Sequence, residues 1–249
     1  MKNEIILNIP HSSLKLPKEF LKREKLLSSA EIQIFNKQMT DLFTDEIFSC
    51  KNYKCIKAKY SRIACDVEKF LNEELEEMAK FGLGVFYKNN LKKQPIFNKK
   101  DEKYEKNMLN KYYYPYHRAL NKIIIRQIRR GKKVLLVDCH SFSREIVIED
   151  RRSENLPDIC LGYDESFCEE KVVKFTYDYF AKLGYSVELN HPYSGAMVPT
   201  KLLNAPNPNF SSLMIEINRD IYLKKNEKSS NFNKIQCEIK KLLELLKYC

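Results

Sequence analysis

Two histidines stand in polar clusters that follow directly on runs of apolar, strand-favouring residues. His11 comes just after residues 4–9, and His140 lies with Asp138 in a cluster that ends the apolar run 134–137. Four β-favouring residues without polar alternation indicate a strand buried on both faces. Because ligands bind at the carboxyl ends of strands in open α/β sheets, His140 and Asp138 are candidate functional residues. The alternative is that both residues only cap the strand.

A carboxylate joins the two imidazoles if the helix after His11 supplies it. Residues 29–48 carry apolar side chains three to four positions apart, as on one helix face, and this helix includes Asp41 and Asp45. Two histidines and one acidic residue form a catalytic zinc set that leaves the fourth position to water. Zinc lowers the pKa of such a water to about 7, so hydrolysis needs no protein nucleophile. We therefore expect His11, His140 and either Asp41 or Asp45 to bind zinc.

A separate carboxylate must accept the proton and return it, and Glu216 is the candidate for this base. It lies in the apolar segment 213–219, which is typical of a buried strand. An extended chain places Glu216 and Asn218 on one face and Arg219 on the other. Arg219 and Arg62 carry planar guanidinium groups suited to a substrate carboxylate. A solvent-facing glutamate and ordinary surface ion pairs are the alternatives.

The other two histidines are interpreted as structural residues. His117 follows a tyrosine-rich segment and His191 precedes a proline. Either one could orient another group or bind substrate, but we expect neither to bind metal. A serine hydrolase is not favoured, because the sequence lacks a Gly-x-Ser-x-Gly elbow and Ser141 directly follows His140.

Strands and helices alternate along the rest of the chain. We expect further strands at residues 54–60, 159–162, 186–189 and 213–219. We expect helices at residues 29–48, 106–130, 165–183 and 232–246, with Pro115 marking a kink or the true start of the second helix and Gly131 its end. This alternation predicts an α/β fold whose sheet is covered by helices on both faces. The length favours a single domain over residues 1–249.

Composition excludes several classes of protein. Of the 249 residues 43% are hydrophobic, yet no apolar run approaches the roughly 20 residues of a membrane span, and the N-terminus lacks a signal-peptide pattern. We expect a cytoplasmic protein with no membrane partner. The net charge of +11 is dispersed among glutamates, which disfavours nucleic acid and permits small anionic ligands. The eight cysteines form no CxxC pair, so we expect reduced thiols and no zinc module at Cys50, Cys55 and Cys65.

Eight short motifs, taken together, resemble the N-formylglutamate amidohydrolase family, a relative of the zinc carboxypeptidases and aspartoacylases. They are Pro10-His11-Ser12, Thr40-Asp41 with Asp45, Ser61-Arg62 with Asp66, Gly82-Leu83-Gly84, Pro115-Tyr116-His117, Asp138-Cys139-His140-Ser141, Asn190 with Pro192-Tyr193-Ser194-Gly195, and Glu216-Ile217-Asn218-Arg219. Each motif is short, but they follow the family's order over nearly the whole chain, which makes the resemblance specific.

The resemblance implies a three-layer α/β/α fold around a mixed central sheet, as in zinc exopeptidases and other phosphorylase/hydrolase-like proteins. It also implies a hydrolase with one zinc ion per chain, held by His11 and His140 with Asp41 preferred as the third ligand, and with Glu216 as the general base. The remaining expected roles are assistance of catalysis by Arg62, substrate binding by Arg62, Asn218, Arg219, Arg144 and Tyr193, and orientation of the ligands by Asp138 and Asp66.

Departures from the family's pattern concern the substrate. Where the family continues with Asp-x-Asn-Arg, Asp66 is followed by Val67, Glu68 and Lys69, and His191 stands where the family often has an acid. We expect a zinc-dependent amidohydrolase acting on a small anionic N-acyl amino acid such as N-formylglutamate. The alternatives are a carboxypeptidase-like peptidase for small peptides and a non-catalytic protein that binds an anionic ligand or nucleic acid.

Overall fold

The computed structural model describes residues 2–147 and 155–249, and the chain forms two compact units. The first, here called the sheet unit, comprises Met1–Ile9, Phe43–Ile56 and Ala119–Cys249. The second, here called the loop unit, comprises Pro10–Leu42 and Lys57–Arg118. The single domain expected over residues 1–249 stays a prediction.

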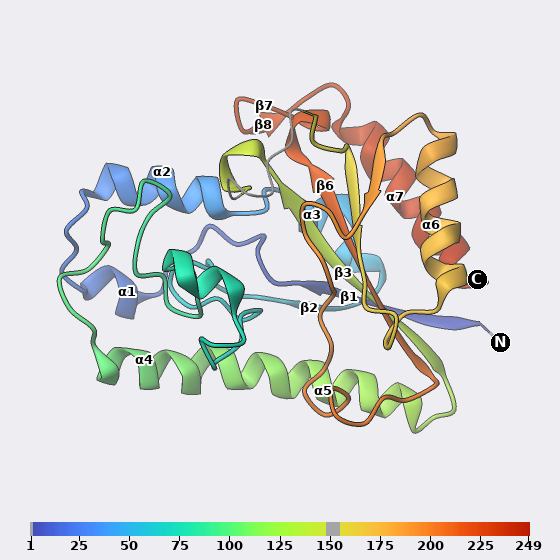
Figure 1. The fold of residues 1–249 in the computed structure, drawn as a ribbon, viewed down its shortest axis with the longest axis horizontal. Helices are drawn as coiled ribbons and strands as arrows, with labels where there is room; N and C mark the ends of the chain where they lie inside the picture. The colour runs from blue at the N-terminus through green and yellow to red at the C-terminus, as the bar shows by residue number, and fades with distance from the viewer. Residues whose placement is uncertain (1, 148–154) are drawn as a thin grey trace. The chain divides into compact units, whose positions relative to one another are not determined.

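A mixed six-stranded sheet forms the sheet unit's centre (Figure 1). The strands, in spatial order, are β2 (Lys54–Lys57), β1 (Asn3–Ile9), β3 (Lys133–Phe142), β6 (Phe210–Asn218), β4 (Ile159–Gly162) and β5 (Val187–Leu189). The strands β1, β3 and β6 are mutually parallel, whereas β4 runs antiparallel to β6 and parallel to β5. A separate hairpin joins β7 (Leu223–Lys224) to β8 (Glu227–Lys228). The expected α/β fold with a mixed sheet is confirmed.

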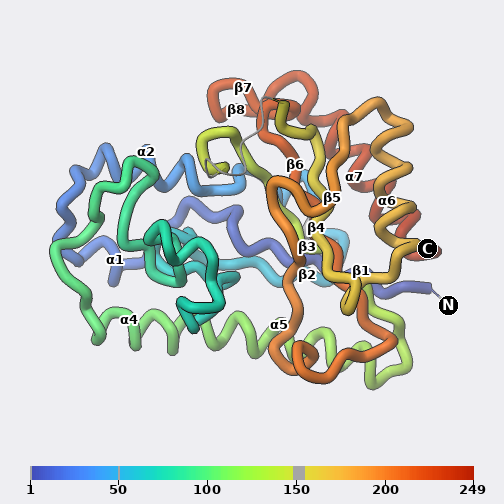
Figure 2. Tube along the Cα trace, viewed as in Figure 1, coloured from blue at the N-terminus to red at the C-terminus, as the bar shows by residue number. Residues whose placement is uncertain are grey.

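Apolar side chains of β1 and β3 pack against helix α5 (Tyr114–Ile128). Ile6 and Leu136 form a buried cluster there with Leu120 and Ile124 of the helix. Alternation along a strand sends the intervening residues to the opposite face of the sheet. Three more helices contact the sheet, namely α3 (Thr44–Ile47), α6 (Glu170–Lys182) and α7 (Phe232–Leu246). Helices α6 and α7 also contact each other, and Figure 2 shows their traces side by side.

The loop unit is built from short helices joined by long irregular segments. Its helices are α1 (Lys18–Lys22), α2 (Ser29–Met39), the 3₁₀ helix η2 (Glu77–Phe81), α4 (Glu102–Met108) and the π-helical turn η3 (Leu109–Tyr113), with α5 continuing from it. Helix α2 begins at a capping box, in which the Ser28 hydroxyl accepts from the Glu31 N–H and the Glu31 carboxylate accepts from the Ser28 N–H.

The expected continuous helix over residues 29–48 is wrong. Helix α2 ends at Met39, and α3 starts only at Thr44. Phe43 between them has a left-handed φ of 64°, and the Asp41 N–H donates to the His11 carbonyl at 3.0 Å instead of to a helical carbonyl. Apolar periodicity alone did not reveal this break, because the spacing stays helical across it.

The expected helix over residues 106–130 begins earlier and runs through Pro115. Residues 102–128 are helical without a gap, and the π-helical turn falls just before the proline. Pro115 therefore marks neither the start of the helix nor a break in it. Gly131, with a φ of 71°, follows the helix as the sequence predicts for a C-terminal stop.

The cysteines depart from expectation at one position. Cys55 is disulfide-bonded, so the prediction that all eight cysteines are reduced is wrong. Six others are free thiols, four of them buried: Cys65, Cys139, Cys160, Cys168, Cys237 and Cys249.

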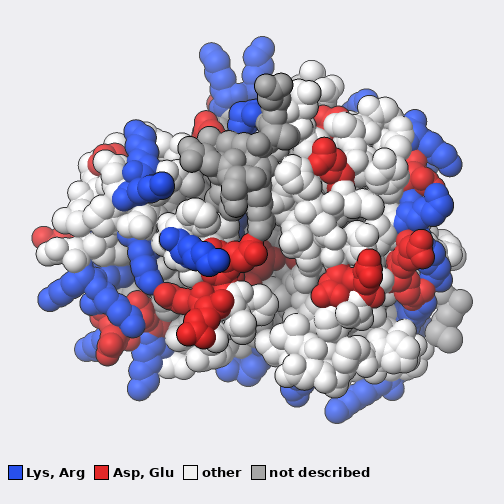
Figure 3. Space-filling view, in the orientation of Figure 1, with Lys and Arg blue, Asp and Glu red and all other residues white. Residues whose placement is uncertain are grey.

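Two further features bear on partners. Lys and Arg side chains spread around the face drawn in Figure 3 with Asp and Glu among them, in keeping with dispersed charge. Within residues 2–147 and 155–249, every helix is too short or too polar to cross a membrane.

Candidate functional site

His140 and Glu216 are direct neighbours across two parallel strands of the sheet unit. The register pairs His140 of β3 with Glu216 of β6, and Glu216 in turn with Cys160 of β4. Paired residues on adjacent strands lie about 5 Å apart and project to the same face. His140 and Glu216 are both buried, with 2% and 7% of their surface exposed. Strand register thus brings this imidazole and this carboxylate side by side in the sheet unit.

Asp138 fixes the orientation of His140. Its Oδ1 accepts from the His140 Nε2 at 3.1 Å and from the Asn8 Nδ2 at 2.7 Å, and its Oδ2 accepts from the Met197 N–H at 2.8 Å. This bond holds the His140 ring in one rotation about its side chain. Asn8 is the residue of β1 that pairs with Asp138, and sequence reasoning did not single it out.

Two residues expected to bind substrate have structural partners in the sheet unit. The Arg219 guanidinium donates to the hydroxyl and the carbonyl of Ser141, at 3.2 and 3.1 Å. Asn218 donates to the Pro157 carbonyl at 3.2 Å and accepts from the Asp220 N–H at 3.1 Å. These bonds hold the turn that follows β6, where the 3₁₀ helix η6 (Arg219–Ile221) begins.

The other two candidates for substrate binding are Tyr193 and Arg144. The Tyr193 hydroxyl donates to the Ile146 carbonyl at 3.3 Å, and the Tyr193 carbonyl accepts from the Cys160 thiol. Arg144 is exposed at the start of the 3₁₀ helix η4 (Arg144–Ile146). Their expected roles stay predictions.

In the loop unit, His11 is surrounded by three carboxylates. Its Nε2 lies 2.8 Å from Asp66 and 3.5 Å from Glu68, and its Nδ1 lies 3.8 Å from Asp41. Burial and the Arg62 charge oppose protonation of the imidazole, but the carboxylates outweigh them and raise the pKa of His11. A concentration of negative charge around a buried imidazole is an environment that attracts a cation.

Asp66 is the centre of this carboxylate cluster. Besides the bond with His11, it accepts from the Arg62 Nε at 2.9 Å, the Tyr87 hydroxyl at 3.0 Å and the Glu68 N–H at 3.1 Å. Burial opposes its ionisation, but the charges of Arg62 and His11 hold the pKa of Asp66 well below its usual range. Asp41 lies 4.0 Å from the Arg62 guanidinium. The expected role of Asp66 in orienting a metal ligand stays a prediction.

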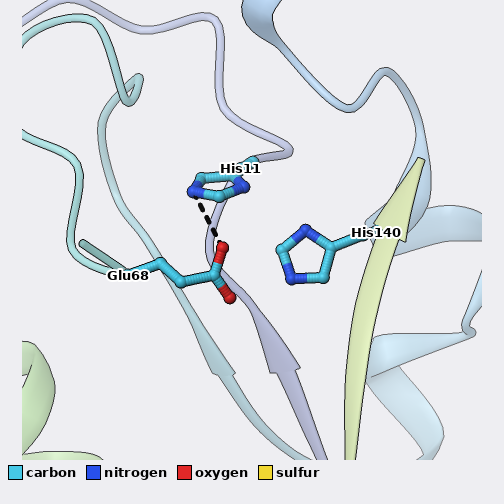
Figure 4. A group of neighbouring side chains, drawn as sticks. All are labelled: His11, Glu68 and His140. Atoms are coloured by element: carbon cyan, nitrogen blue, oxygen red, sulfur yellow. Dashed lines mark ion pairs between the residues drawn. The ribbon is translucent and has the colours of Figure 1, made fainter. Parts of the chain in front are cut away.

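Glu68 is the acidic residue near His11 that sequence reasoning missed as a functional group. Figure 4 draws its carboxylate facing the His11 ring, with the ion pair dashed, and also draws His140 on β3. The sequence signal for Glu68 is the departure from the family's Asp-x-Asn-Arg pattern at residues 68–69. Of the two aspartates left open, Asp41 lies 3.8 Å from His11, whereas Asp45 lies in the first turn of helix α3 in the sheet unit.

The two remaining histidines stand elsewhere. The His117 Nε2 donates to the Val67 carbonyl at 2.8 Å, and burial lowers the pKa of this imidazole. The His191 side chain is 40% exposed and lies 3.8 Å from Glu188. That neither residue binds metal stays a prediction.

Known proteins resemble the chain over most of its length. The profile of the N-formylglutamate amidohydrolase family matches residues 3–223. The crystal structure of N-formylglutamate amidohydrolase from Ralstonia eutropha JMP134 superimposes with a TM-score of 0.82 at 23% identity, covering 99% of this chain and 94% of that chain. A gene product of Agrobacterium tumefaciens gives a TM-score of 0.69 at 20% identity, covering 98% and 92%. No curated protein sequence matches. The structural similarities establish the fold, and because the family profile spans nearly the whole chain, this protein belongs to the N-formylglutamate amidohydrolase family.

Proposed function

We propose that this chain hydrolyses the amide bond of a small N-formyl amino acid with the help of one bound zinc ion. Family membership over residues 3–223 supports the reaction class. The single observation that carries the metal is the pairing of His11 with Glu68 at 3.5 Å in the loop unit (Figure 4), to which we propose that His140 of β3 adds a second imidazole, so that two imidazoles and one carboxylate form the donor set. This set is typical of catalytic zinc sites, which keep a fourth position for water.

Chain connectivity supports the pairing of the two histidines. Only Pro10 separates His11 from the end of β1, and β1 lies beside β3 with Asn8 opposite Asp138. His11 therefore follows a strand whose neighbour carries His140. Glu68 takes the place that the sequence had suggested for Asp41, and Asp41, 3.8 Å from Nδ1, orients the His11 ring.

A zinc ion in this set would supply an activated water at neutral pH and polarise the formyl carbonyl. Glu216 is the proposed general base because it pairs in register with His140 on the same face of the sheet. It accepts a proton from the attacking water and delivers it to the amino nitrogen as the C–N bond breaks, so that formate and the free amino acid leave. Burial of Glu216 shields this proton from bulk solvent.

Arg62 is the residue that we propose to bind the negatively charged group of the substrate. Its guanidinium is mostly buried, with 12% of the side chain exposed, and Asp66 holds it through Nε. A fork fixed in this way can present its terminal nitrogens to a carboxylate or to the developing oxyanion. Arg219 is less suited to this task because it already donates twice to Ser141.

The test is a substrate panel with purified protein. N-formylglutamate, N-acetylglutamate and a glutamyl dipeptide are incubated with zinc-loaded and chelator-treated enzyme, and formate, acetate and free amino acids are quantified. We expect formate release that needs about one zinc per chain. His140→Ala should lose the metal, while Glu216→Gln should keep it and lose activity.

Each alternative has its own outcome. Cleavage of the dipeptide alone would replace the proposal with a peptidase. Zinc binding without hydrolysis of any of the three compounds would replace it with a non-catalytic binding protein. Formate release that survives removal of all metal would refute the zinc mechanism.

A further inference from the structure

Two side chains on one face of a helix donate hydrogen bonds to the backbone on either side of Glu68. The His117 Nε2 donates to the carbonyl of Val67 at 2.8 Å, and the Tyr113 hydroxyl donates to the carbonyl of Lys69 at 2.8 Å. Val67 and Lys69 are the immediate neighbours of Glu68, and this stretch belongs to no helix or strand. Its conformation therefore depends on such side-chain bonds.

The helix is shaped so that both donors reach the loop. Tyr113 and His117 are four residues apart, which puts them on one face, and their rings lie 4.4 Å apart. Between them Pro115 has no N–H to donate, and the Tyr114 N–H bonds to the Leu109 carbonyl five residues back. This π-helical turn is the kind of local widening that often accompanies functional sites.

The same loop is held at two further points. The Glu68 N–H donates to the Asp66 carboxylate at 3.1 Å, and the Phe70 N–H donates to the Glu76 carboxylate at 3.2 Å. Glu76 also pairs with the Lys69 ammonium at 3.1 Å. With these contacts, each residue from 67 to 70 has a backbone group bound by a side chain.

We infer that His117 and Tyr113 are positioning residues, which clamp the chain on both sides of Glu68 and thereby set where its carboxylate lies. The inference rests on the proposed function, because it assigns the clamp to a residue that we propose as a zinc ligand. Without these two hydrogen bonds the irregular loop would let the Glu68 carboxylate move. Loss of groups that orient a metal ligand typically weakens metal binding.

The experiment compares three variants and one control variant with the wild type. Tyr113→Phe and His117→Leu each remove one donor, whereas His117→Gln restores an amide N–H of similar reach. Tyr179→Phe is the matched control: its hydroxyl also donates to a backbone carbonyl at 2.8 Å, that of Glu238, in the sheet unit. Zinc affinity is measured by competition with a chromophoric chelator, and backbone hydrogen exchange of the peptide spanning residues 66–70 is measured without metal.

We expect Tyr113→Phe and His117→Leu to weaken zinc binding roughly 10- to 100-fold, with recovery in His117→Gln. Exchange in residues 66–70 should quicken roughly fivefold in the same two variants, as for loss of one hydrogen bond of ordinary net strength. Tyr179→Phe should change neither quantity. If His117→Leu does not fold, Tyr113→Phe decides alone.

The two proposals fail separately. Unchanged zinc affinity in both donor variants, with normal metal binding by the wild type, overturns the clamp and leaves the proposed function standing. A wild-type chain that binds no zinc overturns the metal site, and the exchange measurement then decides the clamp: unchanged exchange in residues 66–70 refutes it.

Discussion

Replacing Asp66 with asparagine should destabilise the fold more than any exposed charge replacement. Each oxygen of the Asp66 carboxylate accepts two hydrogen bonds. Oδ1 accepts from His11 and the Glu68 N–H, and Oδ2 accepts from Arg62 and Tyr87. In Asp66→Asn one oxygen becomes an NH₂ group. Whichever way the amide turns, two donors of the protein then face a donor, and the buried charge of Arg62 loses its closest partner.

Two independent estimates of the cost agree. Loss of two hydrogen bonds to a charged group, at about 1.5–3 kcal/mol each, amounts to about 3–6 kcal/mol. Removal of one member of a buried ion pair costs about 3–5 kcal/mol, and the Asp66 side chain has no exposed surface while that of Arg62 has 12%. Since domains unfold with only about 5–15 kcal/mol, such a loss removes a large part of the stability.

The measurement is urea unfolding near neutral pH, followed by circular dichroism. Glu73→Gln is the control, because Glu73 pairs with Lys88 at 2.8 Å but both side chains are 58% exposed, and its loss should cost less than about 1 kcal/mol. If Asp66→Asn does not fold, Tyr87→Phe removes a single donor and should cost about 1–3 kcal/mol. A loss in Asp66→Asn no greater than that in Glu73→Gln would refute the reasoning.

Three further predictions concern other parts of the molecule. Asn8→Ala removes a donor from the buried Asp138 carboxylate and should cost about 1–3 kcal/mol in urea unfolding; a loss within error of zero would contradict the network. Leu136→Ala empties a fully buried position beside helix α5 and should cost about 2–5 kcal/mol, read from the same transition. Burial lowers the pKa of His117 in the folded state below its ordinary 6.5, so on acidification the unfolded chain takes up the proton first. The free energy of unfolding of the wild type should therefore be highest above pH 6.5 and fall as the pH drops below it. The fall should be smaller in His117→Gln.

The strands and the groups that they carry could be predicted from the sequence because local patterns determine them. A continuous apolar run indicated β3, and the observed strand Lys133–Phe142 includes His140 near its carboxyl end. The C-terminal helix was expected at residues 232–246 and spans Phe232–Leu246. In both cases the side chains that form the core also produce the periodicity, so the signal and the structure have the same cause.

Breaks in regular structure were harder to predict because they depend on distant partners. The helix after residue 29 stops at Met39, although its apolar spacing continues, since the Asp41 N–H bonds to the carbonyl of His11. The third ligand's candidates, Asp41 and Asp45, could not be separated on that single predicted helix, whereas the break sends them to different units. The left-handed φ of 64° at Phe43 thus lies at the break that assigns the two aspartates to different units.

The position of Glu68 near His11 could not be predicted from local sequence patterns, for a related reason. His140 takes its direction from strand β3, whose alternation can be read from a few neighbouring residues. The direction of Glu68 depends instead on bonds that its neighbours make with a helix 50 and 44 positions along the chain. The sequence contains both halves of this clamp, a tyrosine and a histidine four residues apart and an acidic residue in an irregular loop, but nothing local joins them. Substitutions in the distant helix could therefore reposition the Glu68 carboxylate, which we propose as a ligand, while leaving His11 and His140 untouched. In the site that we propose, the position of this carboxylate is therefore the feature that we expect to change most readily between proteins of the same fold.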